Sequence, residues 1–441
     1  MKGRKWLAIS LAVSMAFAMS GCAKQVEDEK LVIKINGKNE TVLYTGTVND
    51  QKPDGDATFT SEDKSWSGEG TFSDGDFQKG TVKGYPMDVK IGDDSYDGTY
   101  TGAADASGLT GDGKFEASDY DLSYDGSWKS SEMADKGAVT NFPVSLTLTN
   151  TVYSGDYSGD VKDGKPDGTG DFSFDDGESQ VSYSGGWSNG EPAGEGELTD
   201  NDYNLKRYAD GDSIYTGSYE GATTDGLPTN GTFSCSDDGE GDPYTYTGEW
   251  ANGTFNGVGT LTATIDGLDN DYTGNYEDGY WNPTTAQVMK SFGTYPKMSY
   301  NVSDANMKFI DANPDIFPYV PEQNKVDWNS FIDSGITYRQ YIKNPSNYNS
   351  KLMKTPVLYV VQVTEYNLGT KNSEPYTEII GQNLNNIEDE EVYYCFYPGD
   401  LTTLYRGSKV RFVGLPLDNS TYEDTSNGQT NCIVMLMSGI S

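Results

Sequence analysis

A short aromatic–glycine motif recurs through the middle of the chain and constrains its fold more than any other feature. From residue 44 to residue 276, an aromatic residue is followed by a nearby glycine in nine units, spaced about 22 to 32 residues apart. In a strand, residues i, i+2 and i+4 share one face, so ring and glycine lie on the same side of a sheet. The units begin at Tyr44, Trp66, Tyr96, Tyr124, Tyr153, Tyr183, Tyr215, Tyr246 and Tyr272.

Each unit has the length of one β-hairpin. In YSGDYSGDVKDGKPDGTGDFSF, residues 153–174, the turn residues 164–168 separate two short strands. The glycines leave space in which neighbouring rings can lie flat. A lone hairpin is marginal in water, so the units must stack to bury their rings. Residues 41–285 are therefore predicted to form an elongated antiparallel sheet of stacked hairpins.

This pattern resembles the MORN repeat, which reads roughly YxGxWxxGKxxGxGxxxxxxG. The units at 153, 183 and 246 are close matches. The unit at 66 departs from the pattern because Gly70 follows where an aromatic residue is expected, and the unit at 124 lacks the GxG return. The resemblance covers about 230 residues and implies a scaffold or binding surface.

Composition excludes several classes of function. The formal net charge is −37 and the chain has no histidine. A surface this acidic repels phosphate backbones and anionic headgroups, which argues against nucleic-acid partners. Without histidine the chain has no Ser-His-Asp triad and no histidine-ligated zinc. We expect no catalytic residue, no cofactor and no metal site.

The acidic loops leave calcium binding as a possibility to consider. Asp and Gly cluster at 236–242, 266–271 and 200–202, and calcium is bound by oxygen ligands from such loops. None of the three has the twelve-residue EF-hand spacing. We interpret them as solvated turns, with a calcium-stabilised spacer as the alternative.

The N-terminus has the pattern of an export signal. Residues 1–22 have a basic start and an apolar stretch from Trp6 to Met19, as a signal peptide does. The segment Met19-Ser20-Gly21-Cys22 resembles the lipobox of bacterial lipoproteins, although leucine is commoner than methionine at its first position. The resemblance implies a lipidated Cys22, with a palmitate-type acyl anchor. Residues 23–40 would then be a short tether.

The resemblance also implies a location. The anchor would hold the protein on the extracellular face of the cell membrane, at the cell surface. Ala23 rather than aspartate follows the lipidated cysteine, so a host with two membranes would send the protein to the outer one.

Three further cysteines remain, at 235, 395 and 432. An odd number leaves at least one thiol free or paired between chains. Cys395 and Cys432 both fall in the last domain, and a disulfide between them stays open.

The composition changes near Pro283. Residues 286–355 are predicted to contain short helices and a linker, including one helix with Ser303 as N-cap. Residues 356–441 are predicted to form a small barrel, and the run 404–436 resembles the end of an OB-like barrel. The strand candidates are Val357–Tyr366, Tyr376–Gly381, Glu391–Tyr397, Lys409–Leu415 and Asn431–Met437.

The barrel supplies the candidate binding residues. Lys409 and Arg411 share a strand face, Arg406 lies close by, and Tyr393 and Tyr394 offer rings. Binders of single-stranded nucleic acid combine such cations and rings. The acidic run 388–391 argues against that partner, so an oligosaccharide or a protein is the better candidate.

Taken together, the sequence predicts a mainly β protein with MORN-like repeats followed by a small α+β module with an OB-like barrel. We expect a membrane-anchored extracellular lipoprotein that binds or scaffolds a cell-wall glycan or a protein, without catalysis. A surface enzyme acting on glycans through carboxylates is the rival hypothesis.

Overall fold

The computed structural model describes most of the chain from residue 23 onward. Cys22, the predicted lipid anchor, lies outside the described residues, as does most of the acidic loop 236–242. The described residues are 23–91, 94–148, 151–208, 211, 213–237, 243–265, 268–294, 298–321, 323, 326–368, 370–371, 375–384, 391–423 and 429–440.

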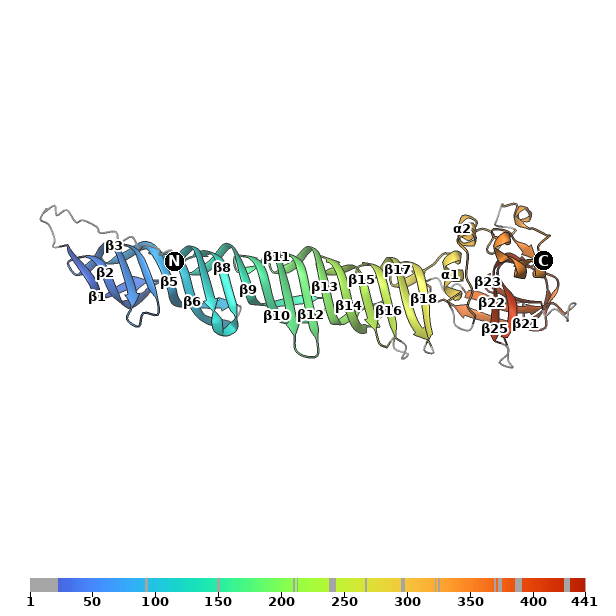
Figure 1. Cartoon of the computed structure of the whole chain (residues 1–441), viewed down its shortest axis with the longest axis horizontal. Coiled ribbons are helices and arrows are strands. Elements are labelled where there is room, and N and C mark those ends of the chain that lie inside the picture. Colours follow the sequence, from blue (N-terminus) through green and yellow to red (C-terminus); the bar gives the residue numbers. More distant parts are fainter. Residues whose placement is uncertain are drawn as a thin grey trace, which may run out of the picture. The chain divides into compact units, whose positions relative to one another are not determined.

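The chain forms two compact units that share the strands of one 19-stranded sheet. Unit 1 contains the described residues up to 145, with 154–172 and 187–191, and unit 2 contains 146–153, 173–186 and the chain from 192 onward. Consecutive strands pair antiparallel from β1 to β9 and from β13 to β19 (Figure 1). The predicted antiparallel sheet of hairpins is thus confirmed.

The strands of this sheet are β1 (Lys24–Ile35), β2 (Lys38–Asn49), β3 (Lys52–Ser61), β4 (Ser67–Ser73), β5 (Asp76–Ile91), β6 (Asp94–Asp105), β7 (Gly108–Ala117), β8 (Leu122–Lys129), β9 (Glu132–Leu148), β10 (Thr151–Lys162), β11 (Lys165–Asp175), β12 (Gln180–Ser188), β13 (Glu191–Leu205), β14 (Tyr215–Thr224), β15 (Leu227–Cys235), β16 (Tyr244–Ala251), β17 (Thr254–Ile265), β18 (Leu268–Glu277) and β19 (Tyr280–Asn282). A 3₁₀ turn, η1 (Ser118–Tyr120), precedes β8.

Strand β1 replaces the tether that the sequence predicted for residues 23–40. It pairs with β2 along most of its length, and Ile33 and Ile35 are buried. Burial alternates along residues 31–35, with Ile33 and Ile35 buried and Val32 and Lys34 exposed, which is the pattern of a strand with one buried face. Among the described residues, the sheet therefore begins at Lys24.

Two-residue turns close the hairpins. In Asn189-Gly190 and Asn252-Gly253 both residues have positive φ, at 52° and 95° and at 54° and 76°. This is the type I′ geometry whose twist matches that of the flanking strands. The turns are also joined to earlier strands by backbone bonds, such as Gly190 N to the carbonyl of Pro166 at 2.8 Å.

A tyrosine ring lying over a pair of glycines is the recurring packing element, which we call the tyrosine–glycine ladder. In the unit at 246, Gly248 and Gly259 face each other across two strands, and the ring of Tyr246 covers them. Its hydroxyl donates to the carbonyl of Glu249 at 2.8 Å. The same i→i+3 bond recurs at Tyr44, Tyr100, Tyr124, Tyr157, Tyr183 and Tyr219, at 2.7–3.0 Å.

Tryptophans connect three of these units to the strand before them. The indole N–H of Trp128 donates to the carbonyl of Gly113 at 2.9 Å, and the ring of Trp128 meets Tyr100 and Tyr124 edge-on, with centroids 5.1 and 5.2 Å away. Trp187 and Trp250 repeat the bond, to Gly170 and Gly231. Such edge-to-face pairs add to simple burial of the rings.

Of the two units that depart from the repeat pattern in sequence, one keeps the ladder and the other is packed by a different ring. At 124 the full ladder geometry is present, because Gly126 faces Gly137 across the strands. In other units a tyrosine stands two residues before the first glycine of the pair. In the unit at 66 the pair is Gly70–Gly80, and the residue two positions before Gly70 is Gly68. The ring of Phe77 packs over Gly70 instead.

The rest of unit 2 contains helices and a second sheet. This sheet has seven strands in the order β20-β25-β26-β23-β22-β21-β24, with β23 and β26 parallel. The elements are α1 (Thr285–Phe292), α2 (Asp304–Ala312), η2 (Trp328–Phe331), α3 (Tyr338–Lys343), η3 (Pro345–Tyr348), β20 (Met353–Lys354), β21 (Leu358–Asn367), β22 (Pro375–Gln382), β23 (Val392–Pro398), β24 (Lys409–Val410), β25 (Phe412–Glu423) and β26 (Gln429–Ile440).

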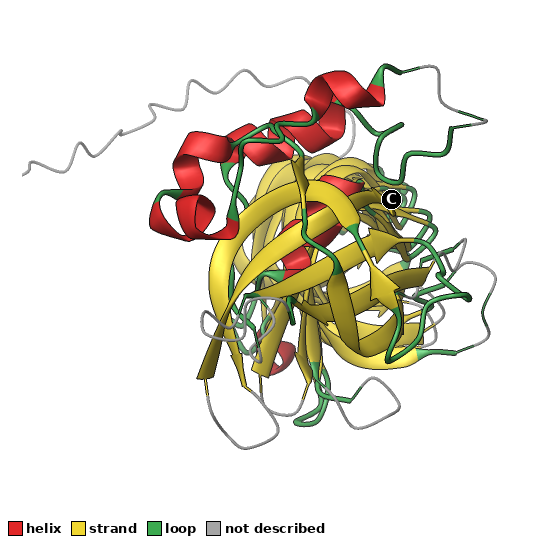
Figure 2. Ribbon diagram, turned by 90° about the vertical axis from the view of Figure 1, so that its right-hand side faces the viewer, coloured by secondary structure: helices red, strands yellow, loops and turns green. Residues whose placement is uncertain are grey.

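This second sheet curls on itself (Figure 2). Only Arg411 separates β24 from β25, yet β24 pairs with β21 and β25 pairs with β26. The continuous segment from β24 to β25 thus pairs with β21 at one end of the strand order and with β26 near the other. All five predicted strands are present, and Ser303 is the N-cap of α2 as predicted.

The ladder yields a stability prediction. A Cβ at Gly259 would lie 2.5 Å from Cζ of Tyr246, and that ring is held by its hydroxyl bond and by Phe255 stacked at 3.8 Å. Gly259→Ala should therefore cost about 1–3 kcal/mol through overpacking, measured as a lower urea midpoint for the chain beginning at Ala23. Gly253→Asn is the control, because that turn glycine has open space and asparagine tolerates its φ. Equal losses in both variants would contradict the ladder.

Candidate functional site

Tyr393, one of the predicted ligand-binding residues, lies in the core of the C-terminal sheet. Its side chain is 1% exposed and packs in a cluster with Leu358, Ile379 and Ile433. The ring is therefore not available to stack on a ligand, contrary to the prediction. The run VYYCFYP of β23 is apolar on both faces, which is the sequence signal of a strand covered on two sides.

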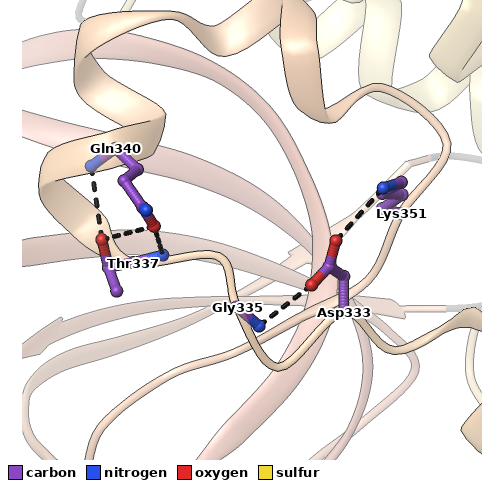
Figure 3. Close-up of polar contacts among 5 residues, drawn as sticks. All are labelled: Asp333, Gly335, Thr337, Gln340 and Lys351. Atoms are coloured by element: carbon purple, nitrogen blue, oxygen red, sulfur yellow. Dashed lines mark hydrogen bonds and ion pairs between the residues drawn. The ribbon is translucent and has the colours of Figure 1, made fainter.

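Helix α3 holds Tyr393 in place from one side. Tyr338 of this helix meets the ring of Tyr393 edge-on, with centroids 5.4 Å apart. Thr337 and Gln340 form a capping box at the start of α3 (Figure 3), which satisfies amides that a helix start leaves free.

The chain before α3 is also fixed by polar contacts. Asp333 accepts from the N–H of Gly335 at 2.9 Å and pairs with Lys351 at 3.1 Å (Figure 3). The Gly335 amide and, after it, Lys351 hold the pKa of Asp333 below its usual value.

The three predicted basic residues lie close together in the chain: Arg406 precedes β24, Lys409 is its first residue, and Arg411 separates β24 from β25. Arg406 and Lys409 are exposed, whereas Arg411 is half-buried. The Nε of Arg411 is buried without a hydrogen-bond partner among the described residues. Whether these residues bind a ligand stays a prediction, but Tyr393 does not join them at a surface.

The outer face of β22 and β23 is covered by the chain's own helix α1 and the segment after it. Phe292 at the end of α1 stacks on Phe396 with centroids 4.9 Å apart, and Tyr300 lies 6.0 Å from the same ring. The hydroxyl of Tyr300 donates to the carbonyl of Met289 at 2.8 Å. Tyr394, the predicted ligand-binding ring on this face, lies 5.5 Å from the covered ring of Phe396.

Helix α1 also contacts the repeat sheet within unit 2. The hydroxyl of Ser291 donates to the carbonyl of Asp271 in β18 at 2.6 Å. Helix α1 falls at the start of the region 286–355 that was predicted to contain short helices, but its own position was not predicted. Its sequence signal is Thr284-x-x-Gln287 after Pro283, the pattern of a capping box, and both capping bonds are formed.

A buried carboxyl group lies under this covered face. Glu378 of β22 is 5% exposed and accepts from the hydroxyl of Tyr366 at 2.8 Å. Burial raises the pKa of Glu378, and hydrogen bonds from Tyr394 and Tyr366 oppose this rise only in part. Tyr394, a predicted ligand-binding residue, thus serves an internal polar contact.

The three described cysteines are buried and not disulfide-bonded. Cys235, Cys395 and Cys432 are separate buried thiols, so the disulfide left open by the sequence is absent. Burial raises the pKa of the Cys432 thiol to about 12, which keeps it protonated and unreactive.

Among the described residues, no three acidic or cysteine side chains gather as metal ligands would. No helix in that part is long and apolar enough to cross a bilayer.

Glu378 gives a prediction about pH. Because its pKa is higher in the folded chain than near 4.5 in the unfolded one, the folded state holds the proton more tightly. The stability from this group is complete below about pH 4.5 and is lost as pH rises through the folded pKa. The melting temperature of Glu378→Gln minus that of the parent chain should therefore increase as pH rises from 4.5 to 8, because only the parent carboxyl must ionise.

The control for this pH series is Glu220→Gln, at an exposed position of the same unit. Circular dichroism melts at each pH supply the measurement. A difference between Glu378→Gln and its parent that stays constant with pH would show that this carboxyl does not titrate between those values.

Comparison with known proteins agrees with the repeat geometry. No curated protein matches the chain. A family model for the MORN repeat matches residues 157–179, 183–205 and 246–264, which fall on the three units that the sequence analysis named as close matches. Each matched segment starts at a ladder tyrosine. The sheet of this chain therefore contains three MORN repeats.

Proposed function

We propose that this protein is an extracellular lipoprotein that scaffolds or binds a ligand of the cell envelope. The observation that carries the proposal is the tyrosine–glycine ladder, which recurs in both units and fixes a regular sheet through its interior rings. MORN repeats suggest a binding or scaffold module of this kind. A regular sheet also suits a surface that is used for recognition rather than for chemistry.

The outward face of the sheet is polar and evenly spaced in unit 2. Thr232, Thr247, Thr260 and Thr273 occupy successive cross-strand positions, and the two outer pairs are hydrogen-bonded at 2.9 Å. Neighbouring strands lie about 4.8 Å apart, so the row presents hydroxyls at a regular interval. Such a face favours a polar partner over an apolar one.

The C-terminal sheet is proposed to be an OB-like barrel. Its support is the closure through β24 and β25 and the parallel pairing of β23 with β26. OB folds use the face of their second and third strands for ligands. Here those strands are β22 and β23, whose outer face is covered by Phe292 and Tyr300, so ligand binding is assigned to other surfaces.

The lipid anchor is proposed at Cys22. Its support is the basic and apolar signal pattern and the lipobox-like Met19-Ser20-Gly21-Cys22. Two or more acyl chains hold a protein firmly on a bilayer, whereas one holds it weakly.

The anchor is tested by Cys22→Ala in cells fed labelled palmitate. The parent chain should carry label and fractionate with membranes, and the variant should lose the label. Cys235→Ala is the control, because this buried thiol should not affect labelling. Label retained in Cys22→Ala would disprove the anchor.

The envelope ligand is tested by co-sedimentation of the chain beginning at Ala23 with purified cell-wall sacculi, at low and high salt. We expect retention that survives high salt, because a polar rather than an ionic contact is proposed. Bovine serum albumin, another acidic protein, controls for trapping. Absence of retention at both salt concentrations would remove the wall as ligand and leave a protein partner.

A further inference from the structure

A cavity of about 160 Å³ lies within unit 2, beside the last hairpin of the repeat sheet. It is lined by the β18–β19 hairpin, by α1, and by residues that follow β21. None of its lining residues belongs to the groups proposed above for ligand binding.

The walls of the cavity combine rings with neutral hydrogen-bonding groups. Trp281 and Tyr376 are mostly buried, and the 5% and 8% of these side chains that stay exposed supply aromatic surface to the cavity. Asn282 and Thr285 supply an amide and a hydroxyl. An aromatic surface next to polar groups suits a ligand with an apolar face and several hydroxyls.

The charges at the rim of the cavity further limit the class of ligand that it can bind. Glu277 lines the cavity and Asp278 beside it pairs with Lys371 at 2.8 Å. The lysine charge is thus already balanced, which leaves the rim with the acidic character of the whole chain. An anionic ligand would be repelled here.

The volume limits the ligand to one ring. Pockets for drug-sized molecules measure roughly 300–1,000 Å³, and at about 30 Å³ per water this cavity has room for roughly five waters. That space corresponds to a single six-membered ring with its substituents.

We propose that this cavity binds one uncharged pyranose ring, at the end or edge of a glycan. The ring lies against Trp281 and Tyr376, and its hydroxyls bond to Asn282, Thr285 and Glu277. The inference deepens the proposed envelope-binding function by naming a site and a ligand class, and it rests on that function for its biological setting. A ligand of this size held by a few contacts binds with a Kd of about a millimolar.

The test uses the chain beginning at Ala23 and free sugars. Saturation-transfer NMR titrations with glucose, galactose and N-acetylglucosamine should give saturable binding of at least one of them. Asn282→Ala should weaken that binding about tenfold, the loss expected for one polar contact. Asn275→Ala is the matched control, because Asn275 faces Asn282 across the strands but does not line the cavity.

A second variant guards against a folding defect. Thr370→Trp places a large ring at the cavity wall and should abolish sugar binding while the circular dichroism melt stays that of the parent. No saturable binding of any of the three sugars, or binding that neither Asn282→Ala nor Thr370→Trp weakens, would overturn the proposal.

The outcomes separate this site from the broader function. Sugar binding without retention on sacculi would support the cavity and reject the wall as ligand. Retention on sacculi that is unchanged in Thr370→Trp, with no sugar binding, would keep the wall-binding function and reject this site.

Discussion

The contact between a tyrosine ring and a pair of glycines is what the rest of the sheet depends on. Only 35% of the residues are hydrophobic, so the sheet cannot be held by a thick aliphatic core. Glycine on both strands lets a ring lie against the backbone, and the hydroxyl then bonds to a carbonyl three residues on. A single side chain thus fills the interior and satisfies a backbone acceptor that would otherwise need water.

The C-terminal module uses aromatic packing for a different purpose. Phe292, Tyr300 and Phe396 cover the face of β22 and β23, and Ser291 bonds to the repeat sheet. Burial of Glu378 under this layer makes the layer sensitive to the protonation of one carboxyl. The module is therefore closed on the side where its strand order would suggest an open binding face.

The sequence was informative wherever side-chain periodicity alone decides the structure. Alternation of rings and glycines predicted the hairpins, and five runs of apolar residues predicted the C-terminal strands. Strand β1 was missed because the residues before Leu31 are mostly polar and only the short stretch from Leu31 to Ile35 carries the apolar residues of a strand. The roles of Tyr393 and Tyr394 were missed because the continuous apolar run of β23, which indicates a strand covered on both faces, does not show what covers each face. That knowledge requires α1 and α3, which pack there from distant parts of the chain.

The unit at 66 shows what a repeat can lose without losing its fold. Phe77 and Phe59 fill the space over Gly70 and Gly68, and Phe72 meets Tyr44 edge-on at 5.5 Å, much as Trp128 meets Tyr100. In this sheet a substitution is tolerated when the space over the glycines stays filled, whichever residue fills it. A ring from either neighbouring strand can do so. Neighbouring hairpins can therefore drift apart in sequence while the sheet stays continuous, which gives evolution freedom to vary the outward face one hairpin at a time.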